Sequence, residues 1–246
     1  MDDVPISIPK NLFGNSGLSF ISLMILYYKM LKEAKNFILD LFYPKFCFLC
    51  QREGSYLCQD CLATLGIFNS HRKYQTENLK DLYFAIDYQN PLIKNLIQKF
   101  KYEPFIKELD RPLSSLIINH FQLLDNQPNF SDFILIPVPL DKKKLKWRGF
   151  NQAEELASEL SNFLKIPLVK ALIKIKETLP QVELSDQERK ENIKGVFACP
   201  APEKIQGRKI LLVDDIYTTG STMAECAKVL KKAGAKEIIG IVVARG

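Results

Sequence analysis

A pair of adjacent carboxylates is the clearest sign of chemistry in this sequence. Asp214 and Asp215 directly follow the apolar run of residues 209–213. A loop of small polar residues comes next: Thr218, Thr219, Gly220, Ser221 and Thr222. The backbone N–H groups of such a loop, with the positive end of a following helix, favour a bound phosphate. The carboxylates suit hydroxyl groups or a metal ion beside it, so we expect a phosphate site at a strand's carboxyl end.

Other nucleotide-binding motifs are absent from the sequence. No Gly-x-x-x-x-Gly-Lys-Ser/Thr segment occurs, and no Gly-x-Gly-x-x-Gly follows a predicted strand. The plain alternative is a strand, a turn and a helix that begins with a Ser or Thr cap. That interpretation leaves the two adjacent acids without a role.

The second chemical feature is a cluster of cysteines. Four of the six cysteines form two Cys-x-x-Cys pairs that are seven residues apart: Cys47, Cys50, Cys58 and Cys61. Four thiolates are the ligand set of a structural zinc site, and they leave no open position for catalysis. The short spacing requires a tight hairpin, in which Gly54 would help the turn. A disulfide or redox pair is the main alternative.

Alternating apolar strands and amphipathic helices must position these residues. We expect strands at residues 82–88, 133–138, 209–213 and 238–243. We expect helices at residues 30–43, 91–100, 106–124, 151–164, 185–194 and 222–233, and residues 168–175 fit either state. Runs that are apolar on both faces and alternate with helices predict a parallel sheet covered on both sides.

Composition indicates a folded domain with a small module. The chain has 246 residues, 47% of them hydrophobic and 25% charged, which excludes global disorder and a fibre. The net charge is 34 − 28 = +6, which permits polyanionic partners without requiring them. Residues 18–28 are apolar but too short to span a bilayer, and no basic segment precedes them. We therefore expect a cytoplasmic protein without stable membrane insertion. Residues 1–29 are expected to be a non-core extension, with Met24 and Met30 as alternative starts to Met1.

The carboxylate segment also carries a family resemblance. LLVDDIYTTGST, residues 211–222, resembles the phosphoribosyl pyrophosphate (PRPP) motif of type I phosphoribosyltransferases. The resemblance implies that Asp214 and Asp215 contact the ribose 2′ and 3′ hydroxyls, as the catalytic-site acids. It also implies that residues 218–222 hold the 5′-phosphate and that a magnesium ion bridges pyrophosphate and ribose oxygens.

Further segments narrow the resemblance to the ComF family, competence-protein relatives of the phosphoribosyltransferases. These are residues 135–157, with an Arg-Gly-Phe-Asn-Gln element, residues 178–197, and the four-cysteine module. The match covers about residues 30–246. It implies an α/β fold with a type I phosphoribosyltransferase-like parallel sheet and flanking helices. A helix plus zinc module would occupy residues 31–70, and the phosphoribosyltransferase-like domain residues 79–246.

A basic run lies within that resemblance. Five cations and one tryptophan occur in seven residues: Lys142, Lys143, Lys144, Lys146, Trp147 and Arg148. The run is either a solvated face or a contact for pyrophosphate or single-stranded DNA, since bases stack on aromatic rings. The resemblance makes the region after Pro137 a pyrophosphate loop and residues 178–192 a flexible hood. We expect Lys142, Arg148 and, in the hood, Arg189 to contact the ligand, because guanidinium groups match phosphate oxygens. Lys99 and Lys101 would add to the positive electrostatic field around the ligand.

Two functions follow from these features. In the first, a ComF-family protein binds PRPP with magnesium and acts in DNA uptake during natural transformation, through single-stranded DNA and proteins of the competence machinery. In the second, an active phosphoribosyltransferase transfers phosphoribose to a base in nucleotide salvage. The zinc module and the basic run favour the first function, and both require the carboxylate segment.

Overall fold

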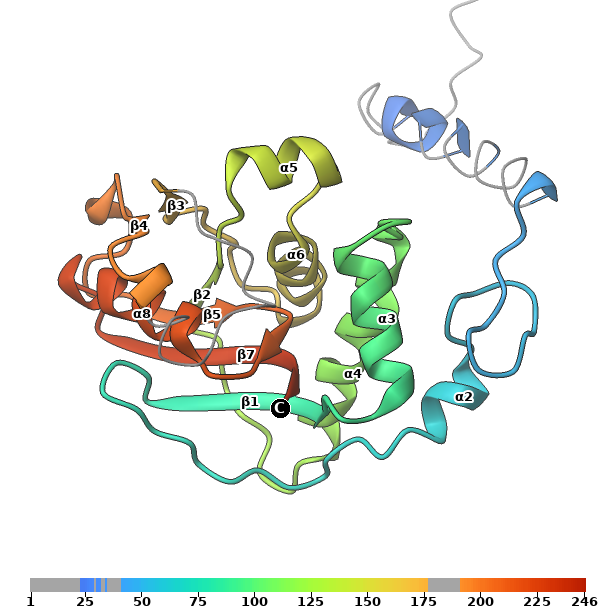
Figure 1. The fold of residues 1–246 in the computed structure, drawn as a ribbon, viewed down its shortest axis with the longest axis horizontal. Coiled ribbons are helices and arrows are strands. Elements are labelled where there is room, and N and C mark those ends of the chain that lie inside the picture. The colour runs from blue at the N-terminus through green and yellow to red at the C-terminus, as the bar shows by residue number, and fades with distance from the viewer. Residues whose placement is uncertain (1–22, 29, 32–33, 35–40, 177–190) are drawn as a thin grey trace, which may run out of the picture.

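The centre of the protein is a parallel sheet, seen in a computed structural model that describes residues 23–28, 30–31, 34, 41–176 and 191–246 (Figure 1). Four strands lie in the order β1, β7, β5, β2, and every neighbouring pair is parallel. Their bounds are β1 Asp81–Asp87, β2 Phe133–Pro137, β5 Lys209–Val213 and β7 Glu237–Arg245. The predicted parallel sheet is confirmed.

The two acids lie in a short gap between two consecutive strands that both pair with β7. A fifth strand, β6 (Ile216–Tyr217), pairs with β7 in the register that β5 already uses. Between β5 and β6, the Asp214 N–H donates to the Ile241 carbonyl at 3.0 Å, and the Asp215 carbonyl accepts from the Val243 N–H at 3.0 Å. The backbone of both acids is therefore held by the central strand.

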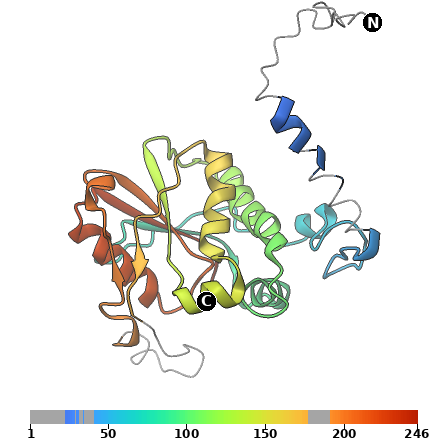
Figure 2. The ribbon, with the colours of Figure 1, turned by 90° about the horizontal axis from the view of Figure 1, so that it is seen from above.

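Helices cover both faces of the sheet (Figure 2). One face carries α3 (Pro91–Lys101), α4 (Asp110–Leu123) and α6 (Gln152–Leu164), and the other carries α8 (Ser221–Lys232). Asn90 caps α3 and Asn151 caps α6 through side-chain oxygens that accept from backbone N–H groups. Shorter elements complete the described fold: α2 (Gln59–Ala63), η1 (Lys107–Leu109), α5 (Lys142–Arg148), β3 (Ile173–Lys174), β4 (Phe197–Ala198) and η3 (Pro202–Lys204).

The region expected to be ambiguous forms short strand contacts. Leu168 makes a parallel bridge with Leu135 at the edge of the main sheet, and β3 pairs antiparallel with β4. The predicted hood and the predicted helix at residues 185–194 lie largely outside the described residues, as does Arg189. The same holds for most of residues 1–29 and for much of the predicted helix at residues 30–43.

The basic run forms a helix, α5, where the family resemblance implied a loop. The Asp141 carboxylate accepts from the Lys144 N–H at 2.8 Å and caps the helix start. Gly149 ends the helix with a φ of 84°, a left-handed conformation that glycine adopts without strain. The residues flanking the run, rather than the lysines, determine its local structure.

The cysteine segment packs against the helices α3 and α4, on the face of the sheet that they cover. Cys47, Leu57 and Cys61 are buried in the same apolar cluster as α3 and α4. Lys99 of α3 also places its ammonium 5.0 Å from the centre of the Phe48 ring. Within the part of the chain that the structure describes, no helix has the length and apolar character that crossing a membrane requires.

Candidate functional site

A cavity of about 1000 Å³ opens at the carboxyl ends of β2 and β5. It brings together both predicted acids and the whole predicted phosphate loop: Asp214, Asp215, Thr218, Thr219, Gly220, Ser221 and Thr222. Residues of α3, α5 and β3 form other parts of its wall. The cavity thus lies at the sheet edge where the sequence predicted a phosphate site, as expected for ligand sites in parallel α/β folds.

The carboxylate pair carries its own counter-ion. Asp215 is only 4% exposed, and its Oδ1 lies 2.8 Å from the Nζ of Lys101, the last residue of α3. Asp214 Oδ1 accepts from the Asp215 N–H at 2.9 Å. Burial and the charge of Asp215 raise the pKa of Asp214 to about 7, against the opposing effect of Lys101. Burial disfavours the charge of Lys101, but Asp215 and Asp214 outweigh it and raise its pKa.

The polar loop leads directly into a helix. Gly220 has a φ of 73°, and the 12-residue helix α8 begins at Ser221. The Thr219 and Ser221 hydroxyls lie 2.9 Å apart, and the Ser221 N–H donates to Thr219 Oγ1 at 3.4 Å. Backbone N–H groups at the start of α8 and these hydroxyls therefore face one end of the cavity, which suits an anion with several oxygens.

Helix α5 contributes one face to the cavity. Lys144, Trp147 and Arg148 line it, at the i, i+3, i+4 spacing of one helix face. Arg148 is half-buried, its Nε is buried without a hydrogen-bond partner, and burial lowers its pKa. Lys142 was predicted to contact the ligand, but it is exposed and not among the residues that line the cavity. Position 142 lies on the opposite face of α5, so contact between Lys142 and the ligand stays a prediction.

Two cationic residues of the site, Lys174 and Lys101, were not assigned a specific role from the sequence. Lys174 of β3 lines the cavity with an 8% exposed side chain, and its Nζ lies 3.7 Å from Asp141 Oδ2. Lys144 approaches the same oxygen at 3.9 Å. Burial and Lys144 lower the pKa of Lys174. No motif signals Lys174, whereas Lys101 was expected only as part of a general positive field.

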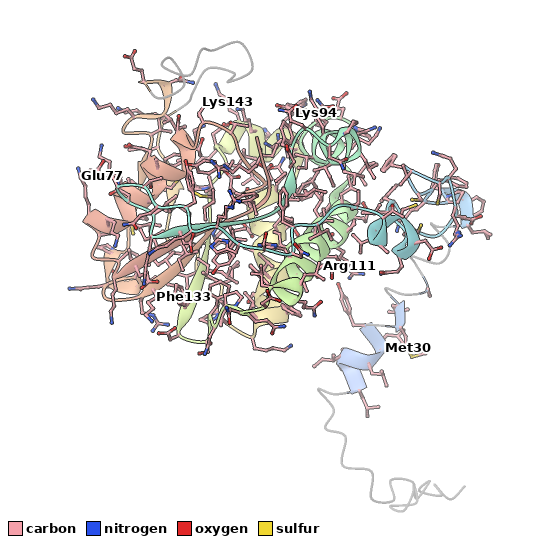
Figure 3. The ribbon with its side chains drawn as sticks, turned by 90° about the horizontal axis from the view of Figure 1, so that it is seen from below. Met30, Glu77, Lys94, Arg111, Phe133 and Lys143 are labelled. Atoms are coloured by element: carbon pink, nitrogen blue, oxygen red, sulfur yellow. The ribbon has the colours of Figure 1, made fainter. Side chains whose placement is uncertain are left out.

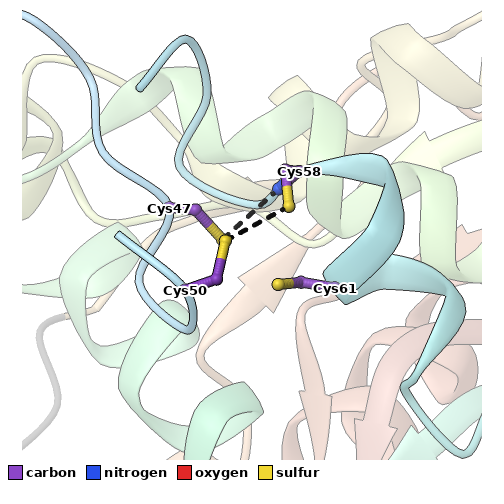
Figure 4. Close-up of side chains that lie close together, drawn as sticks. All are labelled: Cys47, Cys50, Cys58 and Cys61. Carbon is purple, nitrogen blue, oxygen red and sulfur yellow. Dashed lines mark hydrogen bonds between the residues drawn. The ribbon is translucent and has the colours of Figure 1, made fainter. Parts of the chain in front are cut away.

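The four cysteines of the predicted module converge (Figure 4). Their Sγ atoms all lie within 4.8 Å of one another, and none of the six cysteines forms a disulfide. Four sulfurs at about 2.3 Å from one zinc ion would be about 3.8 Å apart, so the cluster could hold a metal with little adjustment. Phe46 and Glu53 form an antiparallel bridge that closes a hairpin around the first Cys-x-x-Cys pair. Gly54 lies just after the bridge, with a φ of 113°, and its N–H donates to the Lys45 carbonyl at 2.8 Å.

The thiols differ in their readiness to ionise. Burial opposes a charge on Cys47, but backbone N–H groups of Cys50 and Cys58 help to lower its pKa to about 6. Burial, together with the neighbouring cysteines, raises the pKa of Cys61. A thiolate at Cys47 is a suitable starting point for a metal, since metal binding releases the protons of thiol ligands.

Parts of the chain are similar to known proteins. Residues 146–246 match the family model described as a phosphoribosyl transferase domain. "Competence protein F" of Haemophilus influenzae is 37% identical over 149 residues, which is 58% of this chain and 63% of that protein. "Competence protein ComFC" of Bacillus subtilis is 30% identical over 154 residues, which is 59% of this chain and 56% of that protein.

A further relative and one solved structure are also similar. "DNA utilization protein YhgH" of Escherichia coli is 38% identical over 105 residues, 42% of this chain and 45% of that protein. A purine phosphoribosyltransferase of Pyrococcus horikoshii aligns over 56% of this chain and 80% of its own with 19% identity and a TM-score of 0.32. That structural likeness is too weak to add to the assignment.

The sheet, its cavity and the matched family model define a protein with a phosphoribosyltransferase-type domain. Within that class the chain is similar to proteins named for competence and for DNA utilization, at 30–39% identity. The matched region spans less than two thirds of the length of each of these relatives, at 63%, 45% and 56%.

Proposed function

We propose that this protein binds PRPP with magnesium and acts in DNA uptake during natural transformation. One observation carries the proposal: the acidic pair and the phosphate loop meet in one cavity at the carboxyl end of β5. A vicinal diol needs paired acceptors and a phosphate needs converging N–H donors. The cavity places both kinds of group within the reach of one sugar phosphate.

The proposed roles follow the chemistry of each group. The hydroxyls of the ribose would donate to Asp214 and Asp215, and the 5′-phosphate would lie among residues 218–222 at the start of α8. The pyrophosphate, with its magnesium ion, would lie toward Lys144 and Arg148, where the buried Nε of Arg148 has no partner. Arg189 stays in the proposal as a hood residue.

The module and the domain have separate tasks in this proposal. Residues 31–70 hold one structural zinc ion through Cys47, Cys50, Cys58 and Cys61. Residues 79–246 bind the ligand. The metal would stabilise a segment whose own apolar core is small, and the module shares the apolar cluster of α3 and α4.

Support for a role with DNA comes from the relatives and from α5. The relatives carry names that refer to competence and DNA utilization. Trp147 is 59% exposed at the cavity rim and lies edge-on to Phe105, so a base could stack on it. The lysines on the outer face of α5 would contact phosphates of a single strand. Proteins of the competence machinery would be further partners.

Calorimetric titration with PRPP and magnesium tests the proposed ligand. We expect saturable binding to the wild-type protein and loss of that binding in the double variant Asp214→Asn/Asp215→Asn. A matched control, Asp132→Asn, removes an acid that pairs with Lys209 outside the cavity and should bind normally. Binding that survives the double change would place the ligand elsewhere.

Transfer of phosphoribose to a base in nucleotide salvage is the second candidate. The observation that favours it is the aromatic part of the cavity wall, where Tyr88 and Tyr102 could hold a base beside the ribose. Release of pyrophosphate from PRPP in the presence of a panel of bases measures this activity. Release above the base-free background would establish an enzyme, and background rates with every base would favour a ligand-binding role.

A further inference from the structure

The counter-ion of the carboxylate pair comes from a distant part of the chain. Lys101 ends α3, and its Nζ lies 2.8 Å from Asp215 Oδ1, with side chains that are 27% and 5% exposed. Lys101 makes a direct ion pair with Asp215, and Arg148 of α5 lies near enough to Asp215 for the two charges to attract each other. The cation therefore belongs to the protein rather than to a ligand.

An ammonium group at this position changes what the acids can bind. Two ionised carboxylates with no counter-ion form a hard oxygen site with two negative charges, which suits a divalent cation. Lys101 cancels one of those charges and occupies one oxygen of Asp215. A divalent ion entering there would face the ammonium at close range in a buried site, where repulsion is screened little.

Neutral hydroxyl groups do not meet this barrier. The Asp215 oxygen that Lys101 leaves unused and the carboxylate of Asp214 can still accept hydrogen bonds. The arrangement therefore distinguishes a vicinal diol from a free metal ion.

We propose that Lys101 is a specificity-determining residue, whose ammonium makes the Asp214–Asp215 pair a site for ribose hydroxyls and excludes a free divalent cation. The inference rests on the proposed function for the identity of the diol. It implies that magnesium enters the cavity with the pyrophosphate of the ligand and not ahead of it. The exclusion of a free cation can be measured without PRPP.

The test is titration of Mn²⁺ alone into the full chain, purified without chelators, with free Mn²⁺ followed by paramagnetic resonance. Wild-type protein should bind Mn²⁺ weakly, and Lys101→Met should bind one ion at least about tenfold more tightly. Adding Asp215→Asn to Lys101→Met should remove the gain. Lys101→Arg, which keeps the charge, should behave like the wild type.

Lys94→Met is the matched charge control. Lys94 lies on the same helix and lines the same cavity, but it is exposed (Figure 3). Its removal changes the net charge equally and should leave Mn²⁺ affinity within about twofold of the wild type. Lys101→Gln replaces Lys101→Met if the latter fails to melt cooperatively.

The outcomes separate the two proposals. Equal Mn²⁺ affinity in wild-type and Lys101→Met proteins, or tight Mn²⁺ binding by the wild type at Asp215, would overturn the role of Lys101. With PRPP and magnesium, Lys101→Met should lose at least about fivefold in affinity because free magnesium then competes with the ribose hydroxyls for the two acids. If no variant or wild type binds PRPP, the proposed ligand is wrong, while the Mn²⁺ comparison still decides the role of Lys101.

Discussion

The phenol of Tyr217 packs directly against the backbone of Gly220. A Cβ atom at position 220 would overlap the Tyr217 hydroxyl and ring, and Gly220 also has a φ of 73°. Both requirements select glycine at the start of α8. Since Tyr217 in turn donates to the Tyr74 hydroxyl at 3.3 Å, the ring has little freedom to move aside.

Gly220→Ala should therefore disrupt the phosphate loop. We expect PRPP affinity to fall by more than about tenfold and the free energy of unfolding by about 2 kcal/mol, from steric overlap and backbone strain. Thermal melts and calorimetry measure the two effects. Gly207→Ala is the control, because Gly207 has a φ of 69° but open space around its Cα. Equal losses in both variants would mean that strain alone, without the Tyr217 contact, explains the result.

The pair Asp214 and Asp215 predicts a pH dependence of stability. The folded-state pKa of Asp214 is about 7, against about 3.9 for an unfolded aspartate. Because the folded state holds the proton more tightly, the wild type loses stability as the pH rises from about 4 to about 7. Asp214→Asn stays neutral, so its stability advantage should grow across that window and level off above it. We expect a gain of about 1–2 kcal/mol at pH 8, measured by denaturant melts.

Asp132→Asn should change the pH dependence of stability in the opposite direction. Hydrogen bonding to Lys209 lowers the pKa of Asp132, so its contribution is present at neutral pH and is lost as the pH falls below about 4. This variant should melt slightly lower than wild type at pH 8 and equally at pH 3. A gain at pH 8 in both variants would point to net charge rather than to the site of Asp214.

The sequence determines the central strands plainly. Residues 210–213 are apolar at every position and are fully buried, as are most residues of β7, so only a strand covered on both faces satisfies them. The acids could be located for the same reason, because the first polar residues after such a strand must emerge at its carboxyl end. In the structure the Asn90 and Asn151 side chains cap α3 and α6, a role that the sequence alone did not assign to them.

Contacts between residues far apart in the sequence could not be predicted from the pattern of apolar and polar residues. Lys101 and Asp215 are 215 − 101 = 114 residues apart, and their pairing depends on how α3 docks on the sheet. Lys174 reaches the cavity only because β3 pairs with β4 and places it near Asp141. The face of α5 that enters the cavity depends on where Asp141 starts the helix, and a shift of one residue would exchange Lys144 for a neighbour.

The cysteine cluster predicts a metal dependence of stability. Metal analysis should find about one zinc ion per chain, and Cys47→Ser or Cys61→Ser should lose it. We expect a loss of at least about 2 kcal/mol, which lowers Tm by roughly 4–8 °C for a chain of this size. Cys199→Ser is the control and should retain both metal and Tm, because Cys199 lies outside the cluster. Full metal content in Cys61→Ser would show that the four thiols do not act as one site.

The two faces of α5 predict separable effects on DNA and PRPP. Lys142, Lys143 and Lys146 are exposed and do not line the cavity, whereas Lys144 and Arg148 do. Replacing the three outer lysines by glutamine should weaken binding of single-stranded DNA. It should also reduce the slope of log affinity against log salt by about 2, since three phosphate contacts are lost. Binding of PRPP should be unchanged within about twofold.

The inner-face variant Lys144→Gln/Arg148→Gln should show the reverse pattern. It removes the cations that face the proposed pyrophosphate, so PRPP affinity should fall by at least about tenfold, while the salt slope for DNA should change by less than 1. Filter binding at several salt concentrations and calorimetry measure the two ligands on the same preparations. An unchanged DNA slope in the outer-face variant would make that face a solvated surface. Parallel losses of both ligands in both variants would mean that DNA and PRPP share one binding surface on α5.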